Sequence, residues 1–406
     1  MDLQVGVIGC GAVGGLCAGL MQEYCPGIST TWFVRETSGV KKAIVDSGEA
    51  VFLTTVSNSQ FSILAKDIVF ESNMDRLLEM DIIIVALKTT ENSKVVAYLS
   101  SALDSCKNHD KFRLVYCFQN GVENADDLRK ALLNKIRLKN SLHTQLVKSR
   151  MEFLDCTVGY NVVLAGNSFK LTTSNPLLLE KSSSVDHDAE ILFSKFSTSF
   201  LGKRQSGFYD VEFKSSDEMS SIKWSKLLIN LSNPVNALSG RNILPMMRNR
   251  EYRLVIAEAM REAARVCKRK NIKLVRVGVH PRLMMAFARF PNFIYNTILP
   301  FIVHIDEDAK FSMHVDLIAG RQTEIDDLNG KVVSEGEKRH LSCPVNRKLV
   351  ELTKEAEKAG HSPNIGPKEL AKLCNVEVSV SSSPFWLVTS IGVVIALCAF
   401  GVSRFM

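Results

Sequence analysis

The chain has 406 residues, of which 46% are hydrophobic and 23% charged, so it can bury a sizeable core and is too long for one ordinary domain. Its net charge of +7 reflects 50 basic against 43 acidic residues. This mild excess suits an anionic small ligand or an acidic membrane surface and does not imply nucleic acid. The 10 cysteines form no Cys-x-x-Cys pair and the 8 histidines no cluster at metal-ligand spacing, so we expect reduced thiols and no metal.

The first predicted elements are a strand over residues 4–8 and a helix over residues 12–22. The turn between them, Gly-Cys-Gly-Ala-Val-Gly, matches G-x-G-x-x-G directly after a strand and at the start of a helix. Gly9 permits the tight turn, Gly11 lets the backbone approach a pyrophosphate, and Gly14 lets helix and strand pack closely. The helix N-terminus offers N–H groups to the phosphates. The predicted dinucleotide-binding residues are Gly9, Cys10, Gly11, Ala12, Val13 and Gly14.

The end of the second strand, residues 30–34, bears on the choice of cofactor. An NAD-binding site places an acid there, about 20 residues after the glycines, to hold the ribose 2′-hydroxyl. Here Arg35 stands at the strand end, and because an arginine pairs with a 2′-phosphate, NADPH is favoured. The alternative is that Arg35 is an ordinary loop residue and the adjacent Glu36 turns inward as the acid.

Two further apolar runs, within residues 80–92 and 111–121, predict strands that are buried on both faces of a parallel sheet. Lys88 and Asn120 stand at the ends of these runs. Ligands of open parallel sheets bind beyond the carboxyl ends of the strands, so both residues are predicted to line the cofactor. Taken singly, each is as often a loop residue or a helix cap.

The rest of the chain divides by composition. Residues 134–150 are basic and poorly patterned, as in a solvated insertion, and residues 156–216 show short β-like runs. Helical periodicity then dominates, and a polar, serine-rich stretch follows it. The expected fold class is α/β, with a Rossmann-type doubly wound parallel sheet followed by an all-α domain. The expected ranges are 1–215 for the NADP-binding domain, 216–360 for the helical substrate domain, 361–384 for a linker and 385–402 for an apolar tail.

The tail has 18 residues and no charged side chain. As a helix it would extend about 27 Å, close to the ~30 Å hydrocarbon thickness of a bilayer, so we predict a single C-terminal transmembrane anchor. The first strand begins within five residues of Met1 and leaves no room for a signal peptide, which favours a protein that faces the cytosol from an intracellular membrane. The alternative is a C-terminal helix packed on a cytosolic protein.

In the helical half, Lys226 and Asn230 lie four residues apart on one face of a predicted helix. A lysine that faces a closed cleft loses hydration, which lowers its pKa and makes it a usable proton donor near neutral pH. The alternative is a surface lysine whose stem lies along the helix.

Residues 311–330 end one helix at Gly320 and start another, with Thr323 as the expected N-cap and Asp326 closing a capping box. Glu324 then occupies the first helical turn. The helix dipole there favours the carboxylate, so Glu324 is better suited to orient a substrate hydroxyl than to donate a proton. The alternative is that Glu324 only caps its own helix.

Together these residues form a set that resembles the ketopantoate reductase family. The motifs that carry the resemblance are the glycine turn, Leu87-Lys88, Asn120-Gly121, Trp224-x-Lys226-Leu-x-x-Asn230, Asn233-Pro234, Ser312-Met313, Asp316, Gly320-Arg-x-Thr-Glu324-Ile-Asp326 and Asn329-Gly330. They span roughly residues 5–360, and the C-terminal motif is much more specific than the glycine turn.

The resemblance implies NADPH-dependent reduction of 2-dehydropantoate to pantoate, a step on the route to coenzyme A. It implies that Lys226 is the general acid and that Glu324 is its partner at the substrate hydroxyl. The substrate-binding residues that it implies are Asn230, Asn233 and Ser312. The cofactor residues that it adds are Lys88, near the cofactor, and Asn120, beside the nicotinamide ribose. A hydride delivered to a keto carbon leaves charge on the oxygen, which a fixed ammonium can stabilise and then protonate.

Two other readings stay open. Residues 281–308 are longer and more apolar than a minimal pantoate pocket needs, which favours the same chemistry on a bulkier or more apolar keto substrate. The other reading is a membrane-anchored NADPH-binding sensor or scaffold without turnover, against which the complete set of Lys226, Asn230, Ser312 and Glu324 argues. A homodimer is compatible with the sequence, which does not determine the oligomeric state.

Overall fold

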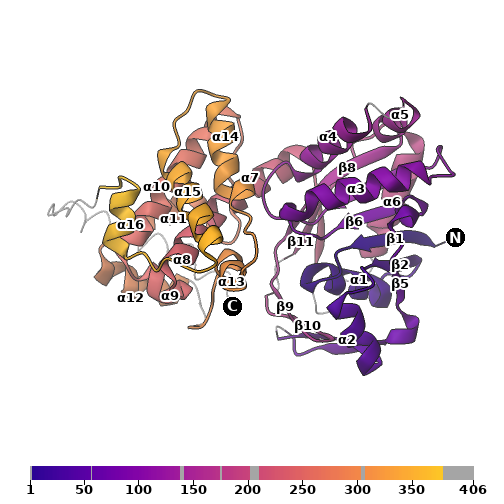
Figure 1. Cartoon of the computed structure of the whole chain (residues 1–406), viewed down its shortest axis with the longest axis horizontal. Coiled ribbons are helices and arrows are strands. Elements are labelled where there is room, and N and C mark those ends of the chain that lie inside the picture. Colours follow the sequence, from indigo (N-terminus) through magenta and orange to yellow (C-terminus); the bar gives the residue numbers. More distant parts are fainter. Residues whose placement is uncertain are drawn as a thin grey trace. The chain divides into compact units, whose positions relative to one another are not determined.

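The computed structural model describes residues 2–55, 57–137, 141–173, 176–201, 210–302 and 307–377. It divides into two compact units, Met1–Lys223 and Trp224–Met406 (Figure 1). The division falls inside helix α7 (Ser216–Asn230), and the boundary expected near residue 216 lies at the start of this helix. Lys223, on the first half of α7, forms an ion pair with Asp155 of unit 1.

The main sheet of unit 1 contains the strands that the sequence predicts for a Rossmann-type domain. Its strands are β1 (Leu3–Ile8), β2 (Ile28–Phe33), β5 (Val69–Glu71), β6 (Ile82–Val85), β7 (Arg113–Cys117), β8 (Met151–Val158), β11 (Leu177–Glu180) and β12 (Val211–Lys214). They lie in the order β12-β11-β8-β7-β6-β1-β2-β5. Every neighbouring pair is parallel except β8 with β11. The four strands predicted around the glycine turn and the cofactor rim are confirmed as β1, β2, β6 and β7.

Helices cover both faces of this sheet. In β6, Ile82 and Ile84 belong to one buried cluster with α1 (Ala12–Tyr24), whereas Ile83 and Val85 belong to another with α3 (Asn92–Asp104) and α4 (Asn124–Ile136). Figure 1 shows α1 and the α3–α4 pair on opposite sides of β1 and β6. A strand buried on both faces needs an apolar residue at every position, which explains the unbroken apolar run in the sequence.

A second, four-stranded sheet, which the sequence did not predict, packs against α1. It is formed by β3 (Glu49–Thr54), β4 (Gln60–Leu64), β9 (Val162–Ala165) and β10 (Ser168–Leu171), in the order β4-β3-β10-β9, and α2 (Gly39–Ser47) precedes β3. Phe52 and Phe169 stack with ring centroids 5.1 Å apart. A Cβ on Gly15 would lie 2.2 Å from Phe169, and one on Gly19 2.2 Å from Phe52. These two glycines therefore let α1 contact the stacked rings.

One sequence expectation for unit 1 was wrong, and another was incomplete. Residues 134–150 are not a solvated insertion, because α4 ends at Ile136 and α5 (Ser141–Ser149) buries Leu146 and Val147 in the same core as β8. The stretch 156–216 contains the short strands as predicted, but it also contains α6 (His187–Leu201), whose Phe196 is fully buried. The 3-10 turns of unit 1 are η1 (Ala65–Asp67), η2 (Met74–Glu79) and η3 (Thr89–Glu91).

Unit 2 is helical, as predicted. Its elements after α7 are α8 (Asn233–Ser239), α9 (Ile243–Met247), α10 (Arg250–Arg269), α11 (Pro281–Phe287), α12 (Asn292–Ile302), α13 (Ser312–Ile318), the π-helix η4 (Asp326–Gly330), α14 (Lys331–Glu337), α15 (Pro344–Ala359) and α16 (Pro367–Leu373). Helix α10 packs against α11, α14, α15 and α16. Its buried Arg253 donates hydrogen bonds to the carbonyls of Ala288 and Phe290 and lies 3.8 Å from the centre of the Tyr295 ring. This arginine thereby fastens the apolar α11–α12 hairpin to the centre of the unit.

The linker predicted over residues 361–384 is wrong in its first part, which is folded. Helix α16 lies within it and buries Leu370 and Ala371 against α10. The segment before α16 is also fixed, because the Tyr252 hydroxyl donates to the Ile365 carbonyl at 2.6 Å and the Ile365 N–H donates to the Leu238 carbonyl at 2.9 Å. Part of the polar composition that suggested a linker therefore belongs to the exposed face of a packed helix, and the serine-rich end of the stretch, residues 379–383, lies outside the described residues.

The predicted transmembrane tail, 385–402, lies outside the described residues. Within the part of the chain that the structure describes, no helix combines the length and the apolar character that crossing a bilayer requires.

Candidate active site

The glycine turn joins β1 to α1 at the carboxyl end of β1, and its three motif glycines meet different surroundings. Gly9 has φ +89°, and a Cβ on it would lie 2.8 Å from the Leu87 nitrogen. A Cβ on Gly14 would lie 2.3 Å from the Gly9 carbonyl oxygen. A Cβ on Gly11 meets nothing within 4 Å. Gly9 and Gly14 are therefore required by the fold itself, whereas the space in front of Gly11 is open to a ligand.

The first turn of α1 has the character of an anion site. Its N-cap, Gly11, has no side chain to bond the first N–H groups, and no acidic residue lies in the turn. Ala12 and Val13, which present these N–H groups, are half-buried. Cys10 is buried, its thiol donates to the Val7 carbonyl at 3.3 Å, and burial raises its pKa, so it contributes backbone rather than a reactive thiol.

Arg35 and Glu36, just after β2, differ in the contacts that their side chains make. Hydrogen bonds from Ser72 and Lys41 occupy the two oxygens of Glu36 and lower its pKa. Arg35 is exposed, and its guanidinium makes no ion pair with any described residue. The acid that competed with Arg35 in the sequence is therefore engaged by unit 1 itself, whereas the arginine remains available to an anion.

Lys88 and Asn120 follow β6 and β7 at the same edge of the sheet as the glycine turn. Lys88 is exposed and precedes η3, and Asn120 is half-buried, with its carbonyl accepting from the Asn124 side chain at 2.8 Å. Between them, the Gln119 side chain donates to the Leu87 carbonyl at 2.9 Å. Because this bond links the ends of β6 and β7, the two predicted residues sit on one rigid rim.

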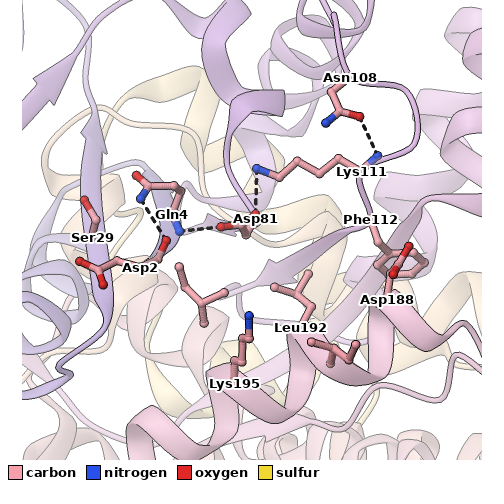
Figure 2. Close-up of a pocket in the computed structure, with 12 residues that line it drawn as sticks. Asp2, Gln4, Ser29, Asp81, Asn108, Lys111, Phe112, Asp188, Leu192 and Lys195 are labelled. Carbon is pink, nitrogen blue, oxygen red and sulfur yellow. Dashed lines mark hydrogen bonds and ion pairs between the residues drawn. The ribbon is translucent and has the colours of Figure 1, made fainter.

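A cavity of about 690 Å³ in unit 1 lies at the opposite edge of the sheet, beside the amino ends of β1, β6 and β7. Figure 2 shows the Lys111 ammonium meeting Asp81, at 2.8 Å, and Gln4 donating to the same carboxylate through its backbone. None of the predicted cofactor residues lines this cavity. Since parallel sheets bind nucleotides at the carboxyl ends of their strands, this cavity is not the dinucleotide site.

The predicted substrate and catalytic residues all lie in unit 2 or on the half of α7 that belongs to it. Lys226 and Asn230 are half-buried on the last turns of α7, and the three apolar residues beside them, Trp224, Leu227 and Leu228, are buried as predicted. The helix breaks at residues 231–232, and α8 begins with buried Asn233 followed by a proline. Lys226 and Asn230, at the end of α7, and Asn233, at the start of α8, therefore flank one short helix break.

Ser312 is the exposed first residue of α13, which packs against α8. The fully buried Asn236 of α8 accepts hydrogen bonds from the Phe311 N–H at 3.1 Å and donates to the Arg241 carbonyl at 2.7 Å. Its oxygen also lies 3.2 Å from Nδ1 of His314. Asn236 thus ties the start of α13, and with it Ser312, to the helix that begins at Asn233.

Glu324 is 7% exposed and precedes η4 rather than occupying a regular first helical turn. The capping box predicted from Thr323 and Asp326 does not form. Instead the Thr323 N–H donates to Glu357 of α15 at 2.8 Å, and the side chain of Asp326 pairs with Lys354 at 2.5 Å. The prediction failed because the Thr323 N–H bonds the carboxylate of Glu357, on a distant helix, and not that of Asp326.

Comparison with known families decides the assignment. Residues 5–149 match the family described as "Ketopantoate reductase PanE/ApbA", and residues 218–357 match its C-terminal part, described as "Ketopantoate reductase PanE/ApbA C terminal". The chain belongs to the ketopantoate reductase family. It is therefore an NAD(P)-dependent oxidoreductase. A search of curated proteins gave no match.

Solved structures share the fold of this ketopantoate reductase family member. A family reductase from Ralstonia eutropha JMP134 has a TM-score of 0.64 at 22% identity, covering 88% of this chain and 99% of that one. A dimeric ketopantoate reductase from Staphylococcus aureus has a TM-score of 0.59 at 16% identity, covering 88% and 100%. D-mandelate dehydrogenase with NADH and anilino(oxo)acetate has a TM-score of 0.62 at 18% identity, covering 88% and 99%.

Sequence reasoning missed the polar residues that hold the predicted ones in place, above all Asn236, Lys354 and Glu357. None of them lies in a motif of its own. The nearest signal was the position of Asn236, three residues after Asn233 in a short helix, which places both near one face. Glu357 lies 33 residues after Glu324 on a separate amphipathic helix, so no local pattern relates the two.

Proposed function

We propose that this family member reduces a 2-keto acid to the 2-hydroxy acid with NADPH, and that 2-dehydropantoate is the substrate. The observation that carries the proposal is the family match over both parts of the chain, together with the presence of Lys226 and Glu324 in the second part. Of the remaining members of the set, Asn233 and Ser312 lie on α8 and α13, which pack against each other in unit 2, and Asn230 is the last residue of α7, just before α8.

The residues of the glycine turn suit a dinucleotide. The pyrophosphate would lie in the open space before Gly11, against the N–H groups of Ala12 and Val13, with Lys88 and Asn120 at the neighbouring strand ends. When bound, the cofactor supplies a hydride to the keto carbon. The choice of NADPH over NADH rests on Arg35, whose exposed guanidinium can pair with a 2′-phosphate while Glu36 is engaged by Ser72 and Lys41.

In this proposal the chain's own residues handle the proton and the orientation of the substrate. The Lys226 ammonium donates a hydrogen bond to the keto oxygen and transfers its proton as charge develops there, and water later restores the proton. The Glu324 carboxylate accepts a hydrogen bond from the hydroxyl that forms. Asn230, Asn233 and Ser312 bind the rest of the substrate and fix the orientation of its keto group.

A bulkier keto substrate is the second candidate, and one observation favours it. The α11–α12 hairpin exposes Leu283 at 45% and Phe293 at 69%, more apolar surface than a small polar acid needs. A protein of the same fold, D-mandelate dehydrogenase, was crystallised with anilino(oxo)acetate, which carries an aromatic ring. The two candidates differ only in the side chain beyond the keto acid group.

The test is oxidation of NADPH by the full chain across a panel of 2-keto acids, from 2-dehydropantoate to branched and aromatic compounds. Lys226→Ala is expected to lower kcat by about 10²-fold or more with NADPH affinity retained, because general acid catalysis contributes on that scale. Lys273→Ala, an exposed lysine of the same unit, is the matched control and should leave kcat unchanged. Normal turnover by Lys226→Ala would remove the proposal.

Two further proposals concern assembly and location. The stretch 385–402 is proposed as a C-terminal membrane anchor, supported by its length and its lack of charge. A homodimer is proposed for this chain because a relative of the same fold from Staphylococcus aureus is described as dimeric.

A further inference from the structure

The backbone before Glu324 is held by a single carboxylate from another helix. Oε1 of Glu357, on α15, accepts a hydrogen bond from the Thr323 N–H at 2.8 Å and another from the Thr323 hydroxyl at 2.6 Å. The Thr323 hydroxyl oxygen in turn accepts from the Ile325 N–H at 3.3 Å. The residues on both sides of Glu324 are therefore connected to Glu357, Thr323 directly and Ile325 through the Thr323 hydroxyl.

The backbone after Glu324 is fixed as well. The Glu324 carbonyl accepts from the N–H groups of Asp327 and Leu328, both at 3.1 Å, at the start of the π-helix η4. At the other end of η4, the Asn329 side chain donates to Asn346 at 2.9 Å. Since π-helical turns are rare and are frequently found at functional sites, this element is a suitable support for one precisely placed side chain.

Lys354 offsets part of the negative charge of this arrangement. Its ammonium lies 2.5 Å from Asp326 and 3.4 Å from the second oxygen of Glu357. The side chain of Glu357 is 14% exposed and Thr323 is 1% exposed. Without Glu357, the two donors of Thr323 would lose their acceptor away from water, and the turn would have to move to satisfy them.

We propose that Glu357 is a positioning residue that fixes the Thr323–Ile325 turn and thereby holds the Glu324 carboxylate at the substrate oxygen. This inference rests on the role proposed above for Glu324. It assigns Glu357 no contact with substrate or cofactor. A displacement of about 1 Å at a catalytic group is enough to lower the rate by up to 10²-fold. A carboxylate that only holds the turn, as Glu357 does, can therefore affect the rate without contacting the substrate.

Glu357→Ala is expected to lower kcat by about tenfold or more while the NADPH dissociation constant stays within about twofold of the wild-type value. Glu357→Gln keeps an oxygen that accepts both Thr323 donors and should recover most of the activity. The matched control is Glu351→Ala on the same helix, because Glu351 is half exposed and, among the described residues, forms an ion pair only with Lys348, at 3.0 Å. It should behave as the wild type.

A double-mutant cycle with Glu324→Gln separates positioning from general support of the fold. If Glu357 acts through Glu324, Glu357→Ala causes no further loss of kcat in the Glu324→Gln background. Equal losses of kcat in both backgrounds would overturn the inference and leave the role of Glu324 intact. Normal turnover by Glu324→Gln alone would instead remove the proposed role of Glu324. Should Glu357→Ala fail to fold, Thr323→Val, which removes only the hydroxyl, enters the same cycle with the same expectation.

Discussion

Replacing Gly11 with alanine tests the contact between the glycine turn and the cofactor apart from the stability of the fold. Gly11 has φ −74° and ψ −155°, extended values that any residue adopts, and an added Cβ meets no atom within 4 Å. Alanine leaves the unfolded chain fewer conformations than glycine does, which stabilises the variant by about 0.4–1 kcal/mol. Alanine is also a poorer N-cap than glycine, which costs a similar amount. We therefore expect the free energy of unfolding to change by less than about 1 kcal/mol.

Binding of NADPH by Gly11→Ala should fall much further. The added methyl group stands where the pyrophosphate approaches the backbone, so the phosphates lose at least one charge-assisted hydrogen bond to the N-terminus of α1. Such a bond contributes about 1.5–3 kcal/mol, which corresponds to a rise of about tenfold or more in the dissociation constant. Calorimetric titration with NADPH and urea unfolding of the same preparation measure the two quantities together.

Gly14→Ala is the matched comparison. Its Cβ would lie 2.3 Å from the Gly9 carbonyl oxygen and 2.9 Å from the Ala86 Cβ, so α1 must move away from β1. Such overpacking costs about 1–3 kcal/mol of stability, and binding should fall with it. A stable Gly11→Ala protein with wild-type affinity for NADPH would refute the reasoning, because the pyrophosphate could not then lie against this turn.

Arg35→Ala should weaken NADPH binding more than about tenfold and leave NADH binding nearly unchanged, because only NADPH carries the 2′-phosphate; equal losses in titrations with both would mean that Arg35 supports the fold instead. Burial disfavours the charge of Glu335, but hydrogen bonds from Lys270 and Lys338 outweigh it and lower the pKa from 4.5 to about 2. The charged Glu335 therefore contributes to the free energy of unfolding above pH 4.5, and this contribution is lost as the pH falls toward 2. Urea unfolding should show that the free energy of unfolding falls less between pH 7 and pH 3 for Glu335→Gln than for the wild type. The full chain should resist carbonate extraction from membranes, and a chain that ends at Ser383 should be soluble; a full chain found only in the soluble fraction would contradict the anchor.

Several features of the fold could be predicted because they depend on neighbours in sequence. A strand buried on both faces is apolar at every position, so 82–85 could be recognised without its partners. The three spaced glycines follow from one turn, in which Gly9 needs positive φ and Gly14 needs room beside Gly9. Lys226 and Asn230 share a helical face because their spacing is close to one turn.

Other features could not be predicted because their partners are distant in sequence. The basic stretch 134–150 contains the end of α4 and the whole of α5, whose apolar residues could be recognised as core only once their packing with β8 was known. The polar segment after residue 360 contains α16, which is stable because α10 covers two of its residues. In both places a short apolar face carries too weak a periodic signal to outweigh the polar composition.

The sequence by itself determined which chemical groups this protein carries and the local elements on which they sit: the glycine turn after β1, Arg35 after β2, Lys226 on α7 and Glu324 after α13. Local spacing is enough for this, because backbone geometry and periodicity act over a few residues. Only the tertiary structure decided how those groups are held. Ser72 donates a hydrogen bond to Glu36, and Thr323 donates two to Glu357. Hydrogen bonds form between groups that are close in space, and a local sequence pattern does not show which distant residues become neighbours.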